Sequence, residues 1–131
     1  MKALIVEDDL TSRILLQEIL KKYGIAHVAV NGKEAVQAVS IALASHEPYQ
    51  LVCLDIMMPE MDGQTALKHI RELEETYGIQ STEGVKAIMT TALNDLKNVS
   101  NAYQNLCDGY LVKPIDRAQL IEELRKFGLV D

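Results

Sequence analysis

Acidic, hydroxyl and basic residues follow four short apolar runs of the sequence. The groups that end these runs are Glu7-Asp8-Asp9, Asp55, Thr90-Thr91 and Lys113-Pro114. If the runs are parallel strands, their carboxyl ends meet at one edge of the sheet, where open α/β sheets bind ligands. Carboxylates that meet there must retain protons or bind a cation. Mg²⁺ suits such a site because it takes oxygen ligands, keeps waters and completes its shell with a phosphate oxygen.

Asp55 has the strongest case for chemistry in this set. The acidic triplet, the threonines and Lys113, taken singly, are explained as a solvated turn, strand residues and surface charge. Asp55 instead directly follows the apolar run 51–54 and precedes Ile56-Met57-Met58-Pro59, so its carboxylate lies in sequence typical of a buried segment. An unpaired buried carboxylate is costly. Beside Mg²⁺, Lys113 and the Thr91 hydroxyl, Asp55 could act as a nucleophile for in-line attack on phosphorus.

The elements that must position these residues alternate between short β-type runs and longer stretches of helical period. This alternation predicts βα units and a parallel sheet covered on both faces. The predicted strands are Ala3–Val6, Ala26–Val30, Gln50–Leu54, Lys86–Thr91 and Tyr110–Val112. Five amphipathic helices are predicted from apolar residues at helical spacing, namely Ile14, Leu15, Ile19 and Leu20; Ala35, Val36, Val39 and Leu43; Leu67, Ile70 and Leu73; Leu96, Val99, Tyr103 and Leu106; and Leu120, Ile121, Leu124 and Phe127.

Local signals support two of the helix starts. Asn31 and Asp116 are predicted N-caps, with Glu34 and Gln119 three residues later as capping-box partners. The acidic cluster Glu72, Glu74 and Glu75 is interpreted as a solvated helix face. The polar stretch 78–84 is predicted to be a loop between the third helix and the fourth strand.

Length and composition fit one globular domain. The chain has 131 residues, of which 48% are hydrophobic and 24% charged. Its formal net charge of −6 disfavours binding to nucleic acid or to an anionic membrane surface. No signal peptide or membrane-spanning apolar run is seen, so a cytoplasmic location is expected. Cys53 and Cys107 are predicted to be reduced thiols, because they form no CxxC pair or Cys/His cluster.

Four segments together resemble the receiver domain of two-component response regulators, and the resemblance covers essentially the whole chain. They are Ile5-Val6-Glu7-Asp8-Asp9, the segment from Leu54 to Gly63 with its Asp-x-x-Met-Pro-x-Met-Asp-Gly pattern, Thr90-Thr91-Ala92, and Tyr110-Leu111-Val112-Lys113-Pro114. The resemblance implies a flavodoxin-like, doubly wound α/β fold. It has a five-stranded parallel sheet of order 2-1-3-4-5 and five helices in three α/β/α layers. Residues 1–131 are expected to be a single receiver domain, similar to stand-alone chemotaxis regulators and without an output domain.

The resemblance also implies residue roles. Asp55 would be the phosphoryl acceptor, and Glu7 and Asp8 the acidic pair at Mg²⁺, for which Mn²⁺ can substitute, whereas Asp9 would lie just outside the site. The further expected roles are the Met57 backbone carbonyl as a metal ligand, Thr91 rather than Thr90 as the switch hydroxyl, Lys113 as the site lysine, Tyr110 as the aromatic that packs inward, a cis Lys113–Pro114 bond, Pro59 and Gly63 in the turn after Asp55, and Asp62 as a helix cap.

The implied function is a switch. A sensor histidine kinase or a histidine phosphotransfer protein would donate the phosphoryl group from phosphohistidine. Phosphorylation would then change the surface of the fourth helix, fifth strand and fifth helix, which a downstream protein reads, or the phosphate would be relayed. The chain is expected to be a monomer without membrane insertion or direct nucleic-acid contact. Apolar residues at Met57 and Leu93 predict restricted water access and slow self-dephosphorylation.

Three other functions are weaker readings of the same residues. A Mg²⁺-dependent phosphohydrolase of the haloacid-dehalogenase type needs a second Asp two residues after its nucleophile, where this chain has Met57. A nucleotide- or flavin-binding module is disfavoured because the loop after the first strand is acidic. A pseudo-receiver that acts only as a scaffold is disfavoured because every residue needed for phosphorylation is present. His27, His46 and His69 lack metal-ligand spacing.

Overall fold

Five parallel strands form the centre of the molecule. The computed structural model describes residues 1–58, 60–80, 83–92 and 106–131. The strands are β1 (Lys2–Val6), β2 (Ile25–Ala29), β3 (Leu51–Asp55), β4 (Lys86–Ala92) and β5 (Gly109–Lys113), in the order β2-β1-β3-β4-β5. This confirms the predicted flavodoxin-like sheet, and every strand end lies within one residue of its predicted position.

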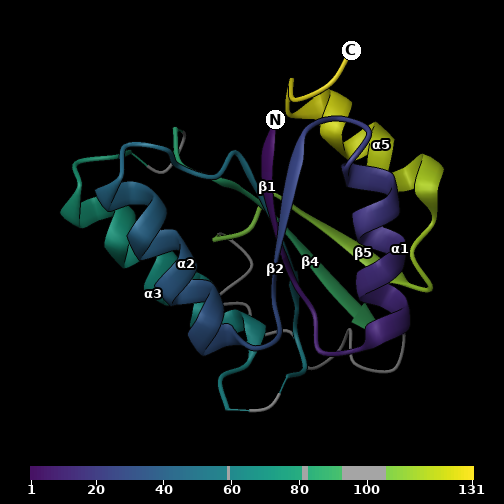
Figure 1. The fold of residues 1–131 in the computed structure, drawn as a ribbon, viewed down its shortest axis with the longest axis horizontal. Helices are drawn as coiled ribbons and strands as arrows, with labels where there is room; N and C mark the ends of the chain where they lie inside the picture. The colour runs from purple at the N-terminus through teal and green to yellow at the C-terminus, as the bar shows by residue number, and fades with distance from the viewer. Residues whose placement is uncertain (59, 81–82, 93–105) are drawn as a thin grey trace.

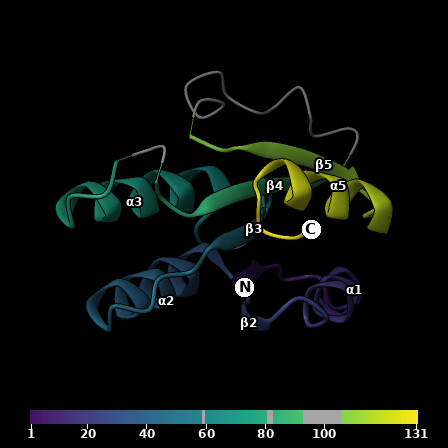
Figure 2. The same ribbon diagram turned by 90° about the horizontal axis from the view of Figure 1, so that it is seen from above.

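Helices cover both faces of the sheet (Figures 1 and 2). On one face lie α1 (Leu10–Leu20) and α5 (Arg117–Lys126), and on the other α2 (Gly32–Ala44) and α3 (Gly63–Thr76). The fourth predicted helix, with Leu96, Val99 and Tyr103, lies outside the described residues. None of the helices in the described ranges has the length and apolar character needed to cross a membrane.

Side-chain alternation along the strands separates the core into two clusters. Residues such as Val52, Leu54 and Met89 pack under α2 and α3. Their neighbours, such as Cys53 and Ile88, pack under α1 and α5. Strand β3 is buried along its whole length, as expected for a central strand covered on both faces. Because successive side chains alternate, Asp55 faces the α1/α5 side of the sheet, as Cys53 does.

The helices begin at the edge of the sheet where the strands end. Asn31 accepts the Glu34 N–H at 2.8 Å, and the Glu34 carboxylate accepts the Val30 N–H at 3.1 Å. Asp116 accepts the N–H groups of Ala118 and Gln119. Both predicted caps are therefore confirmed. Asp62 also caps α3, as predicted, by accepting the Thr65 N–H at 2.8 Å, and Asp9 caps α1 by accepting the Ser12 N–H at 2.9 Å.

The turn after Asp55 is fixed by two glycines. The Gly63 N–H donates to the Ile56 carbonyl at 3.0 Å, and a Cβ at Gly63 would collide with the Asp55 carbonyl. The Gly32 N–H donates to the Met61 carbonyl at 3.2 Å, and a Cβ at Gly32 would collide with that carbonyl. Pro59 of the same turn lies outside the described residues. On the other side of the sheet edge, the Lys113–Pro114 peptide bond is cis, as predicted.

The prediction for Glu74 was wrong. Its side chain is buried, and it binds the Arg71 guanidinium at 2.7 Å and the Val85 N–H at 2.7 Å. Arg71 also binds the Asp108 carboxylate at 3.2 Å and the Leu106 carbonyl at 3.0 Å. Glu74 lies on the inner face of α3, and burial of its carboxylate is tolerated because these partners compensate its charge. The network joins α3 to the starts of β4 and β5.

Both cysteines are thiols, as predicted. Cys53 is buried in the centre of β3, and burial raises its pKa to about 12. A thiol with that pKa is un-ionised at neutral pH and therefore a poor nucleophile.

Candidate functional site

Three carboxylates meet where β1 and β3 end. These strands are adjacent and parallel, with Val6 opposite Leu54, so the residues that follow them converge. Carboxylate oxygens of Glu7, Asp8 and Asp55 all lie within 4.8 Å of one another. Glu7 and Asp55 are buried, whereas Asp8 is exposed at the mouth of the site. The sequence prediction that these residues form one cluster is confirmed.

Lys113 reaches this cluster from the end of β5. Its ammonium nitrogen lies 2.9 Å from Glu7 Oε2 and 3.2 Å from Asp55 Oδ2. The second oxygen of each buried carboxylate accepts a backbone N–H: Asp9 donates to Glu7 Oε1 at 3.1 Å, and Met57 donates to Asp55 Oδ1 at 3.2 Å. The two buried carboxylates thus share the Lys113 ammonium group, and each also accepts one backbone N–H.

The electrostatics of the cluster favour a bound cation. Burial, together with hydrogen bonding to Glu7 and the charge of Glu7, raises the pKa of Asp55 to about 7, although Lys113 opposes the shift. Burial works to lower the pKa of Lys113, but hydrogen bonding to Glu7 and the charges of Asp55 and Glu7 outweigh it, so that the net shift is upward. If all three carboxylates are ionised, one ammonium group leaves two negative charges uncompensated. A divalent cation with a preference for oxygen ligands, such as Mg²⁺, fits this charge and donor set.

Met57 and Asp9 lie at the border of the cluster. The Met57 N–H bond to Asp55 places its peptide beside the carboxylates, while its side chain points outward and is 57% exposed. Metal ligation by the Met57 carbonyl stays a prediction. The Asp9 carboxylate is occupied as the cap of α1, and hydrogen bonding to Ser12 lowers its pKa. Asp9 therefore lies outside the three-carboxylate cluster, as predicted.

Thr91 and Tyr110 share the opposite face of the sheet. Met89 pairs with Tyr110 and Thr91 pairs with Val112, so Thr91 and Tyr110 are diagonal neighbours on the α2/α3 side. The Thr91 hydroxyl donates to the Ala92 carbonyl at 3.1 Å. Burial and the neighbouring Cys107 raise the pKa of Tyr110, which keeps its phenol neutral. The predicted switch, in which Tyr110 packs inward when the Thr91 hydroxyl moves, requires the two residues to be neighbours in this way.

Two residues near the carboxylates were given no role at the site from the sequence: Arg13 was not singled out, and Thr90 was named only as a strand-end hydroxyl. Arg13, in the first turn of α1, donates to the Glu7 carbonyl at 3.4 Å. Thr90 pairs with Asp55 in the sheet and faces the same side. Strand alternation predicts that Thr90 and Thr91 lie on opposite faces of the sheet. Only the register of β4 with β3 shows that Thr90 is the one beside Asp55.

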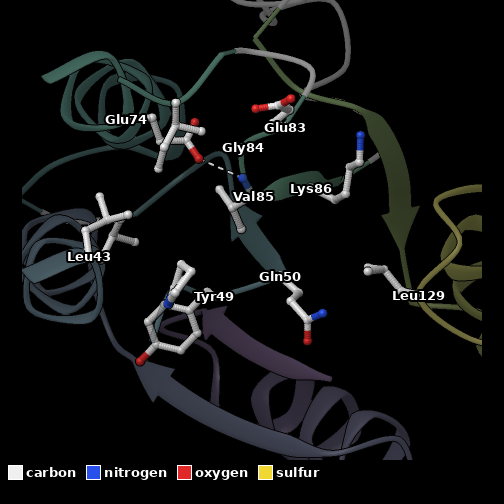
Figure 3. A pocket seen from close by; sticks show the side chains of 12 residues that line it. Leu43, Tyr49, Gln50, Glu74, Glu83, Gly84, Val85, Lys86 and Leu129 are labelled. Carbon is white, nitrogen blue, oxygen red and sulfur yellow. Dashed lines mark hydrogen bonds between the residues drawn. The ribbon is translucent and has the colours of Figure 1, made fainter. Parts of the chain in front are cut away.

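A cavity of about 380 Å³ lies at the other edge of the sheet, where the strands begin (Figure 3). Apolar side chains, including Leu43, Val85 and Leu129, form much of its wall. The Glu74 carboxylate in its wall is already bound to the Val85 N–H, as the dashed line shows. This cavity does not include any member of the carboxylate cluster.

Comparison with known proteins decides the family. A family model described as response regulator receiver domain matches residues 3–125. The chain belongs to this receiver domain family. This receiver domain is 35% identical over 127 residues to chemotaxis protein CheY of Bacillus subtilis, with 95% of each chain covered. It is also 35% identical over 131 residues to hybrid signal transduction histidine kinase G of Dictyostelium discoideum, but it spans only 4% of that protein's length.

Solved receiver structures resemble this receiver domain along almost its whole length. One is the receiver domain of Ssk1 of Saccharomyces cerevisiae in co-crystals with the histidine phosphotransfer protein Ypd1, with a TM-score of 0.80, 29% identity and coverage of 98% of this chain and 88% of the other. Another is the receiver domain of the histidine kinase CKI1 from Arabidopsis thaliana complexed with Mg²⁺ and BeF₃⁻, with a TM-score of 0.76, 26% identity and coverage of 97% and 89%.

Family membership and the carboxylate cluster establish the kind of function. The receiver domain is a phosphorylation-dependent signalling switch, a phospho-acceptor module rather than a classical enzyme. Glu7, Asp8 and Asp55 together offer carboxylate oxygens that could hold a metal ion, and the similar CKI1 receiver domain is complexed with Mg²⁺. The phosphohydrolase and nucleotide-binding alternatives are thereby set aside.

Proposed function

We propose that Asp55 is the phosphoryl acceptor of this receiver domain and that Glu7, Asp8, Asp55 and the Met57 carbonyl hold Mg²⁺. One observation carries the proposal: the buried Asp55 carboxylate lies within 4.8 Å of two other carboxylates and 3.2 Å from the Lys113 ammonium. Mg²⁺, when bound, would reduce carboxylate repulsion and stabilise negative charge on phosphoryl oxygens.

The reaction follows from this arrangement. An Asp55 carboxylate oxygen attacks phosphorus, the P–N bond to the donor histidine breaks, and the leaving imidazole nitrogen keeps the electron pair. The ammonium group of Lys113 is close enough to Asp55 to neutralise charge on the transferred phosphoryl oxygens. The product is an acyl phosphate, which water later hydrolyses.

Thr91 and Tyr110 are proposed to carry the change to the surface. The Thr91 hydroxyl would turn toward the phosphoryl oxygens, and Tyr110 would occupy the space that it leaves. The affected surface includes β5 and α5, together with the segment between β4 and β5 that contains the fourth predicted helix. A two-state surface of this kind lets phosphorylation alter the affinity for a downstream protein.

The phosphorylated state is proposed to be long-lived. The side chain at position 57 is an apolar methionine, which offers no hydrogen bond to a hydrolytic water. Leu93, the second apolar position of the prediction, lies outside the described residues.

The phosphoryl donor is proposed to be a sensor histidine kinase or a histidine phosphotransfer protein. Leu10, Ile14 and Leu15 of α1 are exposed by 58%, 49% and 38%, and α1 begins three residues after Glu7. A protein that brings a phosphohistidine to Asp55 must cover the surface around the site, and these side chains offer it apolar contact area. A cytoplasmic location, a monomeric state and an unidentified downstream protein target complete the proposal.

The deciding experiment is the intact mass of the purified protein after incubation with acetyl phosphate and Mg²⁺. Wild type should gain one phosphoryl group, whereas samples with EDTA and the Asp55→Asn variant should not. A folded wild-type protein that gains no mass, beside a receiver that does, would favour the scaffold function instead. A gain in Asp55→Asn would assign the phosphate to another residue.

A further inference from the structure

The Thr90 hydroxyl is buried without a hydrogen-bond partner in the described part of the chain. The residue is 1% exposed, and its Oγ1 is inaccessible to solvent. An unsatisfied buried hydroxyl destabilises a folded protein, so such a group in a native structure calls for an explanation. Valine has the same shape and would avoid this penalty. The hydroxyl at position 90 therefore adds no hydrogen bond to the described part of the unphosphorylated fold.

Thr90 is the direct neighbour of Asp55 in the sheet. The two residues are register partners on β4 and β3, and the Ile56 N–H donates to the Thr90 carbonyl at 3.0 Å. Register partners on adjacent strands project their side chains from the same face, and adjacent strands lie about 4.8 Å apart. That face is the α1/α5 side, which also holds Cys53 and Ile88. Thr91, the next residue along β4, projects from the opposite face of the sheet.

The donors around the Asp55 carboxylate must change during the reaction. In the present state Asp55 Oδ2 is 3.2 Å from Lys113, and Asp55 Oδ1 accepts the Met57 N–H. In the proposed function Lys113 neutralises the phosphoryl oxygens, so it must release Asp55 Oδ2. The Asp55 carboxyl group then keeps the Met57 N–H but loses the second of its two protein donors.

We propose that Thr90 is a positioning residue that supplies this donor: its hydroxyl turns to the Asp55 carboxyl group when Lys113 engages the phosphoryl group. This inference rests on the proposed role of Asp55. Rotation about the Thr90 Cα–Cβ bond redirects the hydroxyl, because the staggered rotamers place it in different directions. A donor that is unsatisfied before transfer and already bonded in the transition state stabilises that state relative to the ground state, which accelerates transfer.

The test compares Thr90→Val, which removes only the hydroxyl, with Thr90→Ser, which keeps it. Thr90→Val should raise the melting temperature of the unphosphorylated protein by about 3 °C, because the unsatisfied group is gone. With acetyl phosphate and Mg²⁺ its maximal phosphorylation rate should fall about tenfold, the effect of one hydrogen bond to a charged group, at an unchanged half-saturating concentration. Thr90→Ser should restore the rate.

A second readout does not depend on turnover. Mg²⁺ with BeF₃⁻ should raise the melting temperature of Thr90→Val by less than that of wild type, because the bound mimic of the phosphoryl group lacks the Thr90 donor. Thr76→Val is the matched control, since the Thr76 hydroxyl donates to the Glu72 carbonyl at 3.1 Å on α3. That variant should leave the phosphorylation rate and the BeF₃⁻ shift unchanged.

Two results would overturn the inference: a wild-type phosphorylation rate in Thr90→Val, or a loss of melting temperature in Thr90→Val that Thr90→Ser does not share. Either would make Thr90 a structural residue. Failure of the proposed function is recognised separately, because wild type itself would then gain no phosphoryl group.

Discussion

The Lys113 ammonium lies 3.2 Å from the Asp55 carboxylate, although the two residues end strands β5 and β3, which β4 separates. The ammonium also reaches Glu7 beyond β3, at 2.9 Å. A single lysine thus spans the edge of the sheet and holds two buried acids of adjacent strands. Mg²⁺ and Lys113 therefore compensate the same negative charge. Removal of one should lower the free energy of unfolding most when the other is absent.

Replacement of Lys113 by methionine should lower the free energy of unfolding by about 3 kcal/mol in EDTA at pH 8, because two buried carboxylates lose their counter-ion. Saturating Mg²⁺ should restore part of this loss. Urea unfolding with and without Mg²⁺ measures both effects. Lys126→Met is the control, since the exposed Lys126–Glu123 pair, at 3.6 Å, should be worth less than about 0.5 kcal/mol. An equal loss in both media would contradict the shared role.

Asp55→Asn should stabilise the metal-free protein in a pH-dependent manner. The pKa of Asp55 is raised to about 7 from its ordinary 3.8, so between these values the folded state binds a proton more tightly than the unfolded chain does. The wild type therefore loses stability as pH rises through 7. In EDTA the advantage of Asp55→Asn should be largest at pH 8 and shrink as pH falls toward 4. Urea unfolding across this range checks it, and an advantage that grows toward acid would refute the assigned shift.

Gly32→Ala should weaken Mg²⁺ binding several-fold. The first residue of α2 contacts the Met61 carbonyl, and a methyl group there would displace the turn that carries Met57. Stability should also fall by about 1–3 kcal/mol from overpacking. Gly84→Ala is the matched control, because its Cβ would collide with the Glu74 carboxylate at the opposite edge of the sheet. Calorimetric titration should show weakened Mg²⁺ binding only in Gly32→Ala. Equal Mg²⁺ affinities in the two variants would show that the start of α2 does not support the metal site.

Met57→Asn should shorten the lifetime of the phosphorylated state several-fold. The side chain is 57% exposed, so the substitution should change stability by no more than about 0.5 kcal/mol. An amide at this position can orient a water toward the acyl phosphate, which methionine cannot do. Intact mass followed over time after removal of acetyl phosphate gives the decay rate. Ile41→Asn, an exposed position on α2, should decay as wild type does, and an unchanged rate in Met57→Asn would count against control of water access.

Much of this site could be predicted from residue type and position. Glu7, Asp55 and Lys113 follow apolar runs that read as parallel strands, and parallel topology brings strand ends together. The distinction between Thr90 and Thr91 required the register of β4 against β3, which no local pattern contains. Glu74 was misjudged because its neighbours Glu72 and Glu75 are exposed, and its partners Arg71 and Val85 are brought to it only by the packing of α3 on the sheet.

The Arg71–Glu74–Asp108 network sets how β5 can move. Asp108 exchanges two hydrogen bonds with Ala87, of 2.8 Å each through its backbone N–H and its carboxylate, and Arg71 holds the same carboxylate at 3.2 Å. The start of the strand is thereby fastened, while Lys113 at its far end responds to charge at Asp55. Sliding β5 along β4 would break all of these bonds at once. Tilting β5 about Asp108 would keep these bonds. A small displacement of Lys113 would then change the angle between β5, the edge strand, and the rest of the sheet.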